Sequence, residues 1–200
     1  PLLILAPGMQ QGRTVAQPVR NIDLAPTLLD LADINPIPAM DGVTLKPLMS
    51  DAAAQTSLDV YSETGIWLTD LPGIPTGHLR YPNLLDLLTV RNIATGTISI
   101  KPEFEELIVR AKDRAIRSGR WKLVYQPLQE GYLLKLFDTV ADPACLRDVS
   151  TRYPEVMRDM WGRLQQWILS DPLMHSISGI AQQKSTAPTT TRLGASNAES

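Results

Sequence analysis

The chain has 200 residues, 44% of them hydrophobic and 20% charged, and this ordinary globular composition excludes fibrous and strongly disordered classes. Its net charge is −2 with Lys and Arg scattered, so it has no basic stripe for phosphates and nucleic acid is not expected as a partner. A single cysteine, Cys145, excludes an intrachain disulfide, and no apolar run approaches the roughly 20 residues that span a bilayer.

The first two predicted elements are a strand and a helix. The apolar run PLLILAPG, residues 1–8, predicts a buried strand that runs into a loop. Because proteins seldom begin inside a core strand, we expect the chain start to cut through a larger fold. Residues 21–34, NIDLAPTLLDLADI, predict a short and mostly buried helix with Asn21 or Asp23 as its N-cap. Its expected buried face is made by Leu24, Leu28, Leu31 and Ile34.

The middle of the chain is harder to interpret. Residues 35–49 carry three prolines and an Asp-Gly pair, which favour a packed loop. Residues 58–64, LDVYSET, predict a strand by their β-branched and aromatic content. Residues 65–106 mix prolines and glycines with no sustained period, and we expect an ordered excursion, such as a lid or a pocket wall.

The last third of the chain predicts a small sheet with a helix across it. Residues 112–138 contain three short runs separated by Ser-Gly and Glu-Gly turn signals, which indicate an antiparallel meander. Residues 153–172 carry a helical apolar stripe that would cover the sheet. We expect a mobile tail from about residue 181. The expected core tryptophans of this part are Trp121, Trp161 and Trp167.

Four stretches, in this order, resemble the C-terminal half of sulfatases, which belong to the alkaline-phosphatase-like superfamily. They cover most of residues 1–170, whereas the excursion from 65 to 107 is unlike the commonest sulfatases. The four stretches are PLLILAPG, NIDLAPTLLDLADI followed by MDGVTLKPLM, AIRSGRWKLVY, and KLFDTVADPACLRDVSTRYPEV.

The resemblance implies an α/β fold. Residues 1–64 would be the end of a large α/β sandwich, with the remainder of that domain upstream, and 65–111 would be a family-atypical pocket wall. Residues 112–180 would form a small C-terminal subdomain, an antiparallel sheet packed on a helix, followed by a disordered tail at 181–200. The compartment is not indicated.

The resemblance also implies a sulfuric ester hydrolase that uses a formylglycine, made within a Cys/Ser-x-Pro-x-Arg motif, and a calcium or other divalent ion. The sequence has no such motif, and Cys145 lies in PACLRD without the Pro and Arg. We therefore expect no catalytic residue and no metal ligand in this chain, and no activity from it alone. Asp23 and Asp30 lie seven residues apart, and capping explains Asp23 better than metal binding.

Four residues are candidates for binding a small-molecule or sugar sulfate ester. Glu63 ends a predicted strand, although a plain strand-end ion pair with an Arg explains it better. His78 and Arg80 would form a cationic pair suited to an anionic ester, the alternative being a solvated loop histidine. Trp67 could stack on a sugar or aryl group, or anchor the excursion as a buried side chain.

Two alternatives to a sulfatase segment stay open. A phosphonate or phosphodiester hydrolase, or a phosphoethanolamine transferase, of the same superfamily would show a similar C-terminal half. A non-catalytic interaction module would belong to a different class, but a start inside a strand would leave it with an exposed edge and a large apolar surface.

Overall fold

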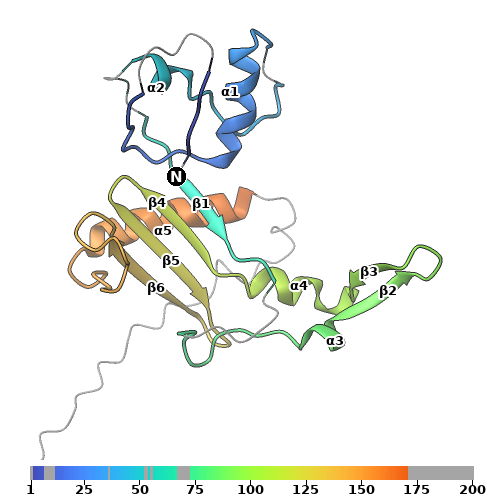
Figure 1. Cartoon of the computed structure of the whole chain (residues 1–200). Helices are drawn as coiled ribbons and strands as arrows, with labels where there is room; N and C mark the ends of the chain where they lie inside the picture. The colour runs from blue at the N-terminus through green and yellow to red at the C-terminus, as the bar shows by residue number, and fades with distance from the viewer. Residues whose placement is uncertain are drawn as a thin grey trace, which may run out of the picture. The chain divides into compact units, whose positions relative to one another are not determined.

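A computed structural model describes residues 2–6, 12–35, 37–51, 54, 56–66 and 73–170 (Figure 1). The chain forms two compact units. Unit 1 comprises Pro1–Val60 with Arg117–Gly119, and unit 2 comprises Tyr61–Ile116 with Arg120–Ser200. The mobile tail expected from residue 181 lies outside the described residues. None of the described helices is long and apolar enough to cross a bilayer.

Unit 1 contains the predicted helix, in a shorter form. A 3-10 turn, η1 (Asn21–Asp23), leads into α1 (Leu24–Leu31). The expected buried face is wrong, because Leu28 is 66% exposed and Ile34 is 55% exposed. The buried residues are Asp23, Pro26 and Thr27. A polar side of the helix is turned inward because Thr27 Oγ1 accepts a hydrogen bond from the Leu45 N–H at 2.8 Å.

The rest of unit 1 corrects two predictions. Residues 2–6 form no strand, and Leu3 and Leu5 are more than 90% exposed. The described part of unit 1 offers this segment no neighbouring strand to pair with, which explains why its apolar pattern does not produce one. The loop predicted for 35–49 ends earlier, at the short helix α2 (Lys46–Ser50), which Pro47 favours because its ring suits the first turn of a helix.

Gly42 explains why the Asp-Gly pair follows the helix. A Cβ atom at this position would lie 2.0 Å from the carbonyl oxygen of Ile22, so only glycine allows the two backbone segments to approach so closely. The next residue, Val43, then donates its N–H to Asp23 Oδ1 at 2.9 Å. The loop is thereby hydrogen-bonded to the start of α1.

Unit 2 is built on the predicted meander, which the structure confirms. Its four-stranded sheet has the order β1 (Val60–Glu63), β4 (Arg114–Ser118), β5 (Trp121–Pro127) and β6 (Tyr132–Asp138). Strands β5 and β6 pair antiparallel, from Trp121 opposite Asp138 to Pro127 opposite Tyr132. The first strand, β1, confirms the prediction for LDVYSET.

The predicted covering helix is α5 (Pro154–Ser170), which lies across the sheet in Figure 1. Leu164 and Met160 are fully buried against the sheet, as the helical stripe predicts. Two parallel aromatic stacks join helix to strands, Tyr125 with Trp161 at 5.3 Å between ring centroids and Tyr61 with Trp167 at 4.9 Å. Trp121, Trp161 and Trp167 all pack against the core cluster, as expected.

Between the two parts of the sheet, the excursion is ordered over residues 73–110. It contains α3 (Leu84–Leu87), a hairpin of β2 (Leu88–Asn92) and β3 (Thr97–Ile100), and α4 (Pro102–Arg110). The hairpin was not predicted, because each strand is only four or five residues long. The turn signal before β3 is Gly96, which adopts a φ of +64°.

The turn after β6 is organised by two aspartates. Asp138 accepts hydrogen bonds from the N–H groups of Val140 and Ala141, and forms an ion pair with Arg120. The pKa of the Asp138 carboxyl is held below its usual value chiefly by the hydrogen bond from Arg120. Asp142 caps the following turn by accepting two further backbone N–H bonds. Cys145, half-buried in this loop, is a small loop residue rather than part of a site.

Candidate functional site

A cluster of polar side chains lies where the end of β1 meets the start of β4. We call it the Asp113 cluster. It brings together three segments that are far apart in the sequence, namely the end of β1, the loop at 73–83, and the facing parts of β4 and β5. Its members are Glu63, Thr64, His78, Lys112, Asp113, Arg114 and Gln126.

Asp113 is the centre of this cluster. Its two carboxylate oxygens face different partners, because Oδ1 lies 2.7 Å from His78 Nε2 and Oδ2 accepts from Gln126 Nε2 at 3.0 Å. Its backbone is bonded to Thr64 in both directions, each time at 3.0 Å. One aspartate therefore connects the loop, two strands and the residue that follows β1.

His78 is buried, with a side chain that is 0% exposed. Its Nδ1 lies 2.7 Å from the carbonyl oxygen of Leu79, which can only accept, so Nδ1 carries a hydrogen. Its Nε2 faces Asp113, so the close contact requires a proton between the imidazole and the carboxylate. The hydrogen bond between His78 and Asp113 holds the loop on the sheet.

Backbone hydrogen bonds hold the same loop in place. His78 forms a bridge with Leu128, and the Leu79 N–H donates to the Pro127 carbonyl at 3.0 Å. On the other side, the Gln129 N–H donates to the carbonyl of Gly77 at 2.8 Å. The loop thus extends the end of β5, which explains why a histidine with no helical or strand pattern around it becomes buried.

The cations of the cluster surround Glu63. Lys112 forms an ion pair with one Glu63 oxygen, and Arg114 Nε lies 3.5 Å from the other. The Arg114 side chain is only 2% exposed and also donates to the carbonyl of Val109 at 2.8 Å. Glu63 is therefore a strand-end carboxylate paired with cations, which is the plain structural alternative that its position in the sequence suggested.

The four substrate-binding candidates are only partly brought together. Glu63 and His78 belong to the same cluster, joined through the backbone of Thr64 and Asp113. The alternative of a solvated loop histidine is wrong because the His78 side chain is buried, whereas a cationic pair of His78 and Arg80 stays a prediction. Arg80 lies on the exposed side of the loop, two residues further along. Trp67 lies outside the described residues.

Asp113 and Gln126 were missed by sequence reasoning. Asp113 follows a lysine in a charged stretch, and Gln126 ends an alternating strand, so neither differs from an ordinary surface residue in pattern. The Gln126 Oε1 atom is buried without a hydrogen-bond partner among the described residues. Such an atom is a suitable place for a water molecule or a ligand hydroxyl.

A second buried carboxylate, Asp23, is found in unit 1 and has a structural role. Burial alone would raise its pKa, but hydrogen bonds from Arg20 and from the Val43 N–H outweigh this, and the pKa lies below the usual value. Asp30 is paired with Lys46 at 2.8 Å. The two aspartates are thus taken up by separate ion pairs, and the metal interpretation is not supported by their geometry.

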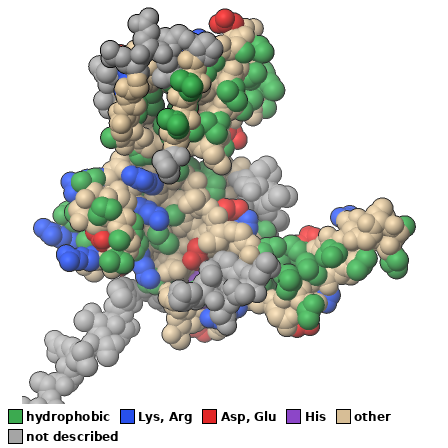
Figure 2. All heavy atoms as spheres, in the orientation of Figure 1, with side chains coloured by type: hydrophobic (Ala, Val, Ile, Leu, Met, Phe, Trp, Pro, Cys, Tyr) green, Lys and Arg blue, Asp and Glu red, His purple; other side chains and the backbone are tan. Residues whose placement is uncertain are grey.

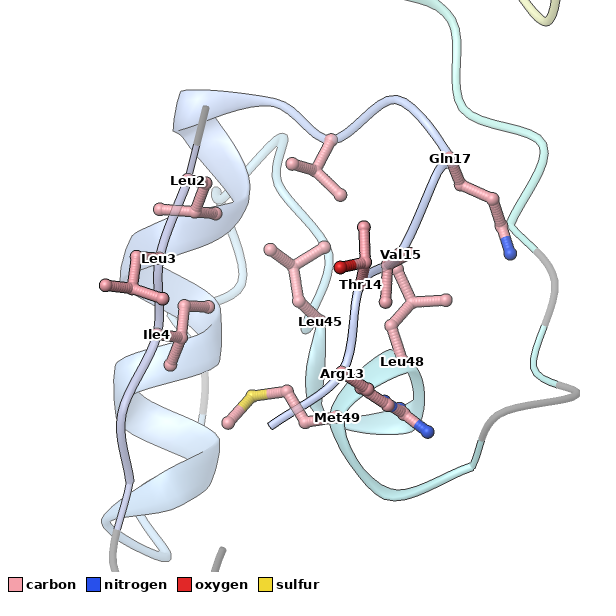
Figure 3. Close-up of a pocket in the computed structure, with 11 residues that line it drawn as sticks. Leu2, Leu3, Ile4, Arg13, Thr14, Val15, Gln17, Leu45, Leu48 and Met49 are labelled. Carbon is pink, nitrogen blue, oxygen red and sulfur yellow. The ribbon is translucent and has the colours of Figure 1, made fainter. Parts of the chain in front are cut away.

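An open cavity of about 450 Å³ lies in unit 1 (Figure 3). Its wall is mainly aliphatic, with Leu2, Leu45 and Leu48 among the lining residues, and Arg13 is the one charged residue among the described residues that line it. Glu63, His78 and Arg80 do not line it. The cavity suits apolar packing rather than recognition of an anion.

Within the described ranges, no group of three or more His, Cys, Asp or Glu side chains is arranged to hold a metal ion. These residues therefore do not fit a calcium site.

Comparison with known proteins identifies the relatives of this chain. Residues 1–63 match the family described as N-sulphoglucosamine sulphohydrolase, C-terminal. Human arylsulfatase K is 27% identical over 157 residues, which are 78% of this chain and 23% of that protein. The resemblance to the C-terminal region of sulfatases is confirmed.

Two further proteins extend this comparison. Human N-acetylglucosamine-6-sulfatase is 43% identical over 58 residues, which are 28% of this chain and 10% of that sulfatase. The solved structure of a phosphonate monoester hydrolase from Silicibacter pomeroyi matches 87% of this chain and 28% of its own chain, with 23% identity and a TM-score of 0.48. The chain spans about a quarter of the length of arylsulfatase K.

Proposed function

We propose that this chain is the C-terminal part of a metal-dependent sulfatase that hydrolyses sulfate esters, with the nucleophile and the metal ligands upstream. The observation that carries the proposal is the match of residues 1–63 to a sulphohydrolase C-terminal family, together with arylsulfatase K relatives along about four-fifths of the chain. Calcium and a formylglycine would be supplied by the upstream part, where a sulfatase uses them to neutralise the sulfate oxygens and to attack the sulfur.

The surface of unit 1 supports the proposal that this unit is part of a larger domain. Large apolar side chains are exposed on it, including Leu3, Leu5 and Leu28 at 94%, 91% and 66%. Figure 2 shows hydrophobic side chains at the surface in this part of the chain. Such patches normally pack against further protein. We propose that residues 1–64 come from the end of a large α/β sandwich and that residues 112–180 form a small C-terminal subdomain, whose sheet also includes β1.

The Asp113 cluster would contribute specificity rather than chemistry. It fixes the loop at 73–83 through the His78–Asp113 contact, and that loop carries the exposed Arg80. A guanidinium presented on a fixed loop attracts an anionic ester and orients it. The expected substrate class is a sugar sulfate, because the matched family and one related sulfatase are both named for glucosamine derivatives that carry sulfate.

The test is to assay the native protein that carries these 200 residues against an aryl sulfate and an aryl phosphate diester, with and without calcium or manganese. We expect metal-dependent sulfate turnover by the native protein and none by the 200-residue chain alone. Turnover by the chain alone would show that the active site is placed wrongly. Turnover of the phosphate diester in preference to the sulfate would instead favour the phosphoryl hydrolases of the superfamily.

The role of the loop is tested separately with Arg80→Gln in the native protein. Loss of the guanidinium should raise KM for the sulfate several-fold and change kcat little, because the interaction is made equally with substrate and transition state. Arg91→Gln is the matched control, since Arg91 is also exposed in unit 2 but lies on the hairpin β2–β3. Equal KM values for both variants would remove Arg80 from the substrate site.

A further inference from the structure

The two ring nitrogens of the buried His78 both face oxygen acceptors. Nδ1 lies 2.7 Å from the carbonyl oxygen of Leu79, and Nε2 lies 2.7 Å from Asp113 Oδ1. A neutral imidazole carries a single N–H, so it can donate to one of these oxygens and must present a lone pair to the other. The imidazolium carries two N–H groups and can donate to both. The geometry therefore fits the protonated ring, whose buried charge is paired with a carboxylate and fully hydrogen-bonded.

The other charged groups of the Asp113 cluster offset one another. Two are carboxylates and two are cations, and both cations pair with the same carboxylate, which leaves Asp113 as the counter-ion of the ring. Strand β5 contributes a neutral group, Gln126, which donates to the second Asp113 oxygen at 3.0 Å. The loop itself carries Arg80 and the turn after β5 carries Glu130, and both residues are exposed. Histidine is the one residue type among these neighbours whose charge ordinarily changes between about pH 5 and pH 8. The four charged groups are Glu63, Lys112, Asp113 and Arg114.

Loss of the ring proton would weaken the attachment of the loop at 73–83. In either tautomer of the neutral ring, a nitrogen lone pair meets an oxygen lone pair at 2.7 Å in a buried position, which is unfavourable. The ring must then move away from one of its two partners. Two backbone bonds attach the same loop to the end of β5, because the Leu79 N–H donates to Pro127 at 3.0 Å and the Gln129 N–H donates to Gly77 at 2.8 Å. Movement of the ring between them would weaken these bonds as well.

We propose that protonated His78 fixes the loop at 73–83 to the sheet through Asp113, and that the loop is released when the ring loses its proton. Only the protonated ring holds both hydrogen bonds, so the attachment is complete at low pH and is lost as the pH rises. Asp113 is a positioning residue, because it affects the exposed Arg80 by fixing the loop that carries it. The inference goes beyond the proposed function and does not rest on it, since it concerns the position of the loop and not the group that Arg80 binds.

The proposal is tested by amide hydrogen exchange of the native protein from about pH 5 to pH 8, with each rate expressed relative to an unstructured peptide at the same pH. We expect the protection of the Leu79 and Gln129 amides to fall roughly tenfold or more over this range, which corresponds to the loss of about one hydrogen bond to a charged group. The Val149 amide, which donates to the Leu136 carbonyl near the opposite end of β6, should keep its protection. Constant protection of Leu79 and Gln129 over the range overturns the proposal.

Two substitutions of Asp113 separate the role of the proton from that of the side chain. In Asp113→Asn the carboxamide N–H can donate to Nε2 of a neutral His78 while its oxygen accepts from Gln126, so the loop should stay protected over the whole pH range. Asp113→Ala removes both contacts and should lower the protection at every pH. Glu130→Gln is the matched control, because it removes an exposed carboxylate from the adjacent turn and should keep the pH dependence of the unmodified protein. A fall in protection that persists in Asp113→Asn overturns the proposal.

NMR of the ring nitrogens of His78 in the unmodified native protein gives a second measurement, which stands even if a variant fails to fold. We expect two protonated ring nitrogens at about pH 5 and one at about pH 8. A single protonated nitrogen at the lower pH would mean that the ring is neutral while the loop is attached, and the proposal fails. Neither measurement uses a substrate, so a lack of sulfate turnover would refute the proposed function and leave this inference unaffected.

Discussion

Replacing Gly42 with alanine is expected to destabilise unit 1 severely although it adds a single methyl group. The new Cβ would lie 2.0 Å from the carbonyl oxygen and 2.6 Å from the carbonyl carbon of Ile22. Both atoms are backbone, so no flexible side chain can turn aside. The chain at position 42 must move by about 1 Å or more to reach an ordinary contact distance.

The magnitude follows from what that movement breaks. Overpacking alone costs roughly 1–3 kcal/mol. The shift also draws the Val43 N–H away from Asp23 Oδ1, at present 2.9 Å, and a hydrogen bond to a charged acceptor contributes roughly 1.5–3 kcal/mol. The bond from Leu45 to Thr27, at 2.8 Å, lies two residues further along. Because neighbouring effects are not additive, we expect a loss of roughly 3–5 kcal/mol.

Amide hydrogen exchange in the native protein measures this most directly. Protection of the Val43 and Leu45 amides should fall roughly a hundredfold or more, since each 1.4 kcal/mol is about a factor of ten. Gly12→Ala is the matched control, because nothing lies within 4 Å of a Cβ placed there. If the two variants show the same protection at Val43 and Leu45, the close approach of residues 22 and 42 is refuted.

Three further predictions concern buried groups. Tyr125→Phe should leave the free energy of unfolding unchanged or raise it by about 1 kcal/mol, because the Tyr125 hydroxyl has no partner among the described residues and burial raises its pKa to about 12; a clear loss in urea denaturation would contradict this. Leu164→Ala should cost roughly 2–5 kcal/mol and Leu169→Ala, at a 37% exposed position, under about 1 kcal/mol, both measured by urea denaturation, and equal costs would argue against the packing of α5. Burial of Asp23 raises its pKa, but the hydrogen bonds from Arg20 and Val43 outweigh burial and lower it. The stability that ionised Asp23 contributes is therefore complete above the usual pKa of 3.8 and is lost as the pH falls through the lowered pKa. Asp23→Asn should weaken the dependence of the thermal midpoint on pH between pH 5 and pH 2, and an unchanged dependence would contradict this prediction.

The meander and α5 could be predicted because their patterns have one physical cause. Alternation along β5 buries Leu123 and Tyr125, and the helical stripe buries Met160 and Leu164 on the facing helix. Hydrophobic periodicity predicts the wrong buried face where a polar group determines the packing. In α1 the Thr27 hydroxyl, bonded to the Leu45 N–H, turns the opposite side of the helix inward and leaves Leu28 in solvent.

The candidate site was predictable only in part, for a related reason. Glu63 and His78 are candidates by residue type, whereas Asp113 owes its importance to contacts with residues 35 and 49 positions earlier in the chain. No local pattern records contacts of that range. The hairpin was missed because Val90 and Ile98 alternate over too few residues to define a period.

The order of elements in unit 2 has a consequence for synthesis of the protein. All four strands of the sheet precede α5 in the chain, yet α5 supplies Met160, Leu164 and Ile168 to the shared core. The segment from Asp138 to Ser170 takes roughly 2–6 s to translate at about 5–20 residues per second. During that interval the apolar side of the nascent sheet has no helix to cover it. Residues 116–136 are therefore where we expect a ribosome-associated chaperone to bind the growing chain.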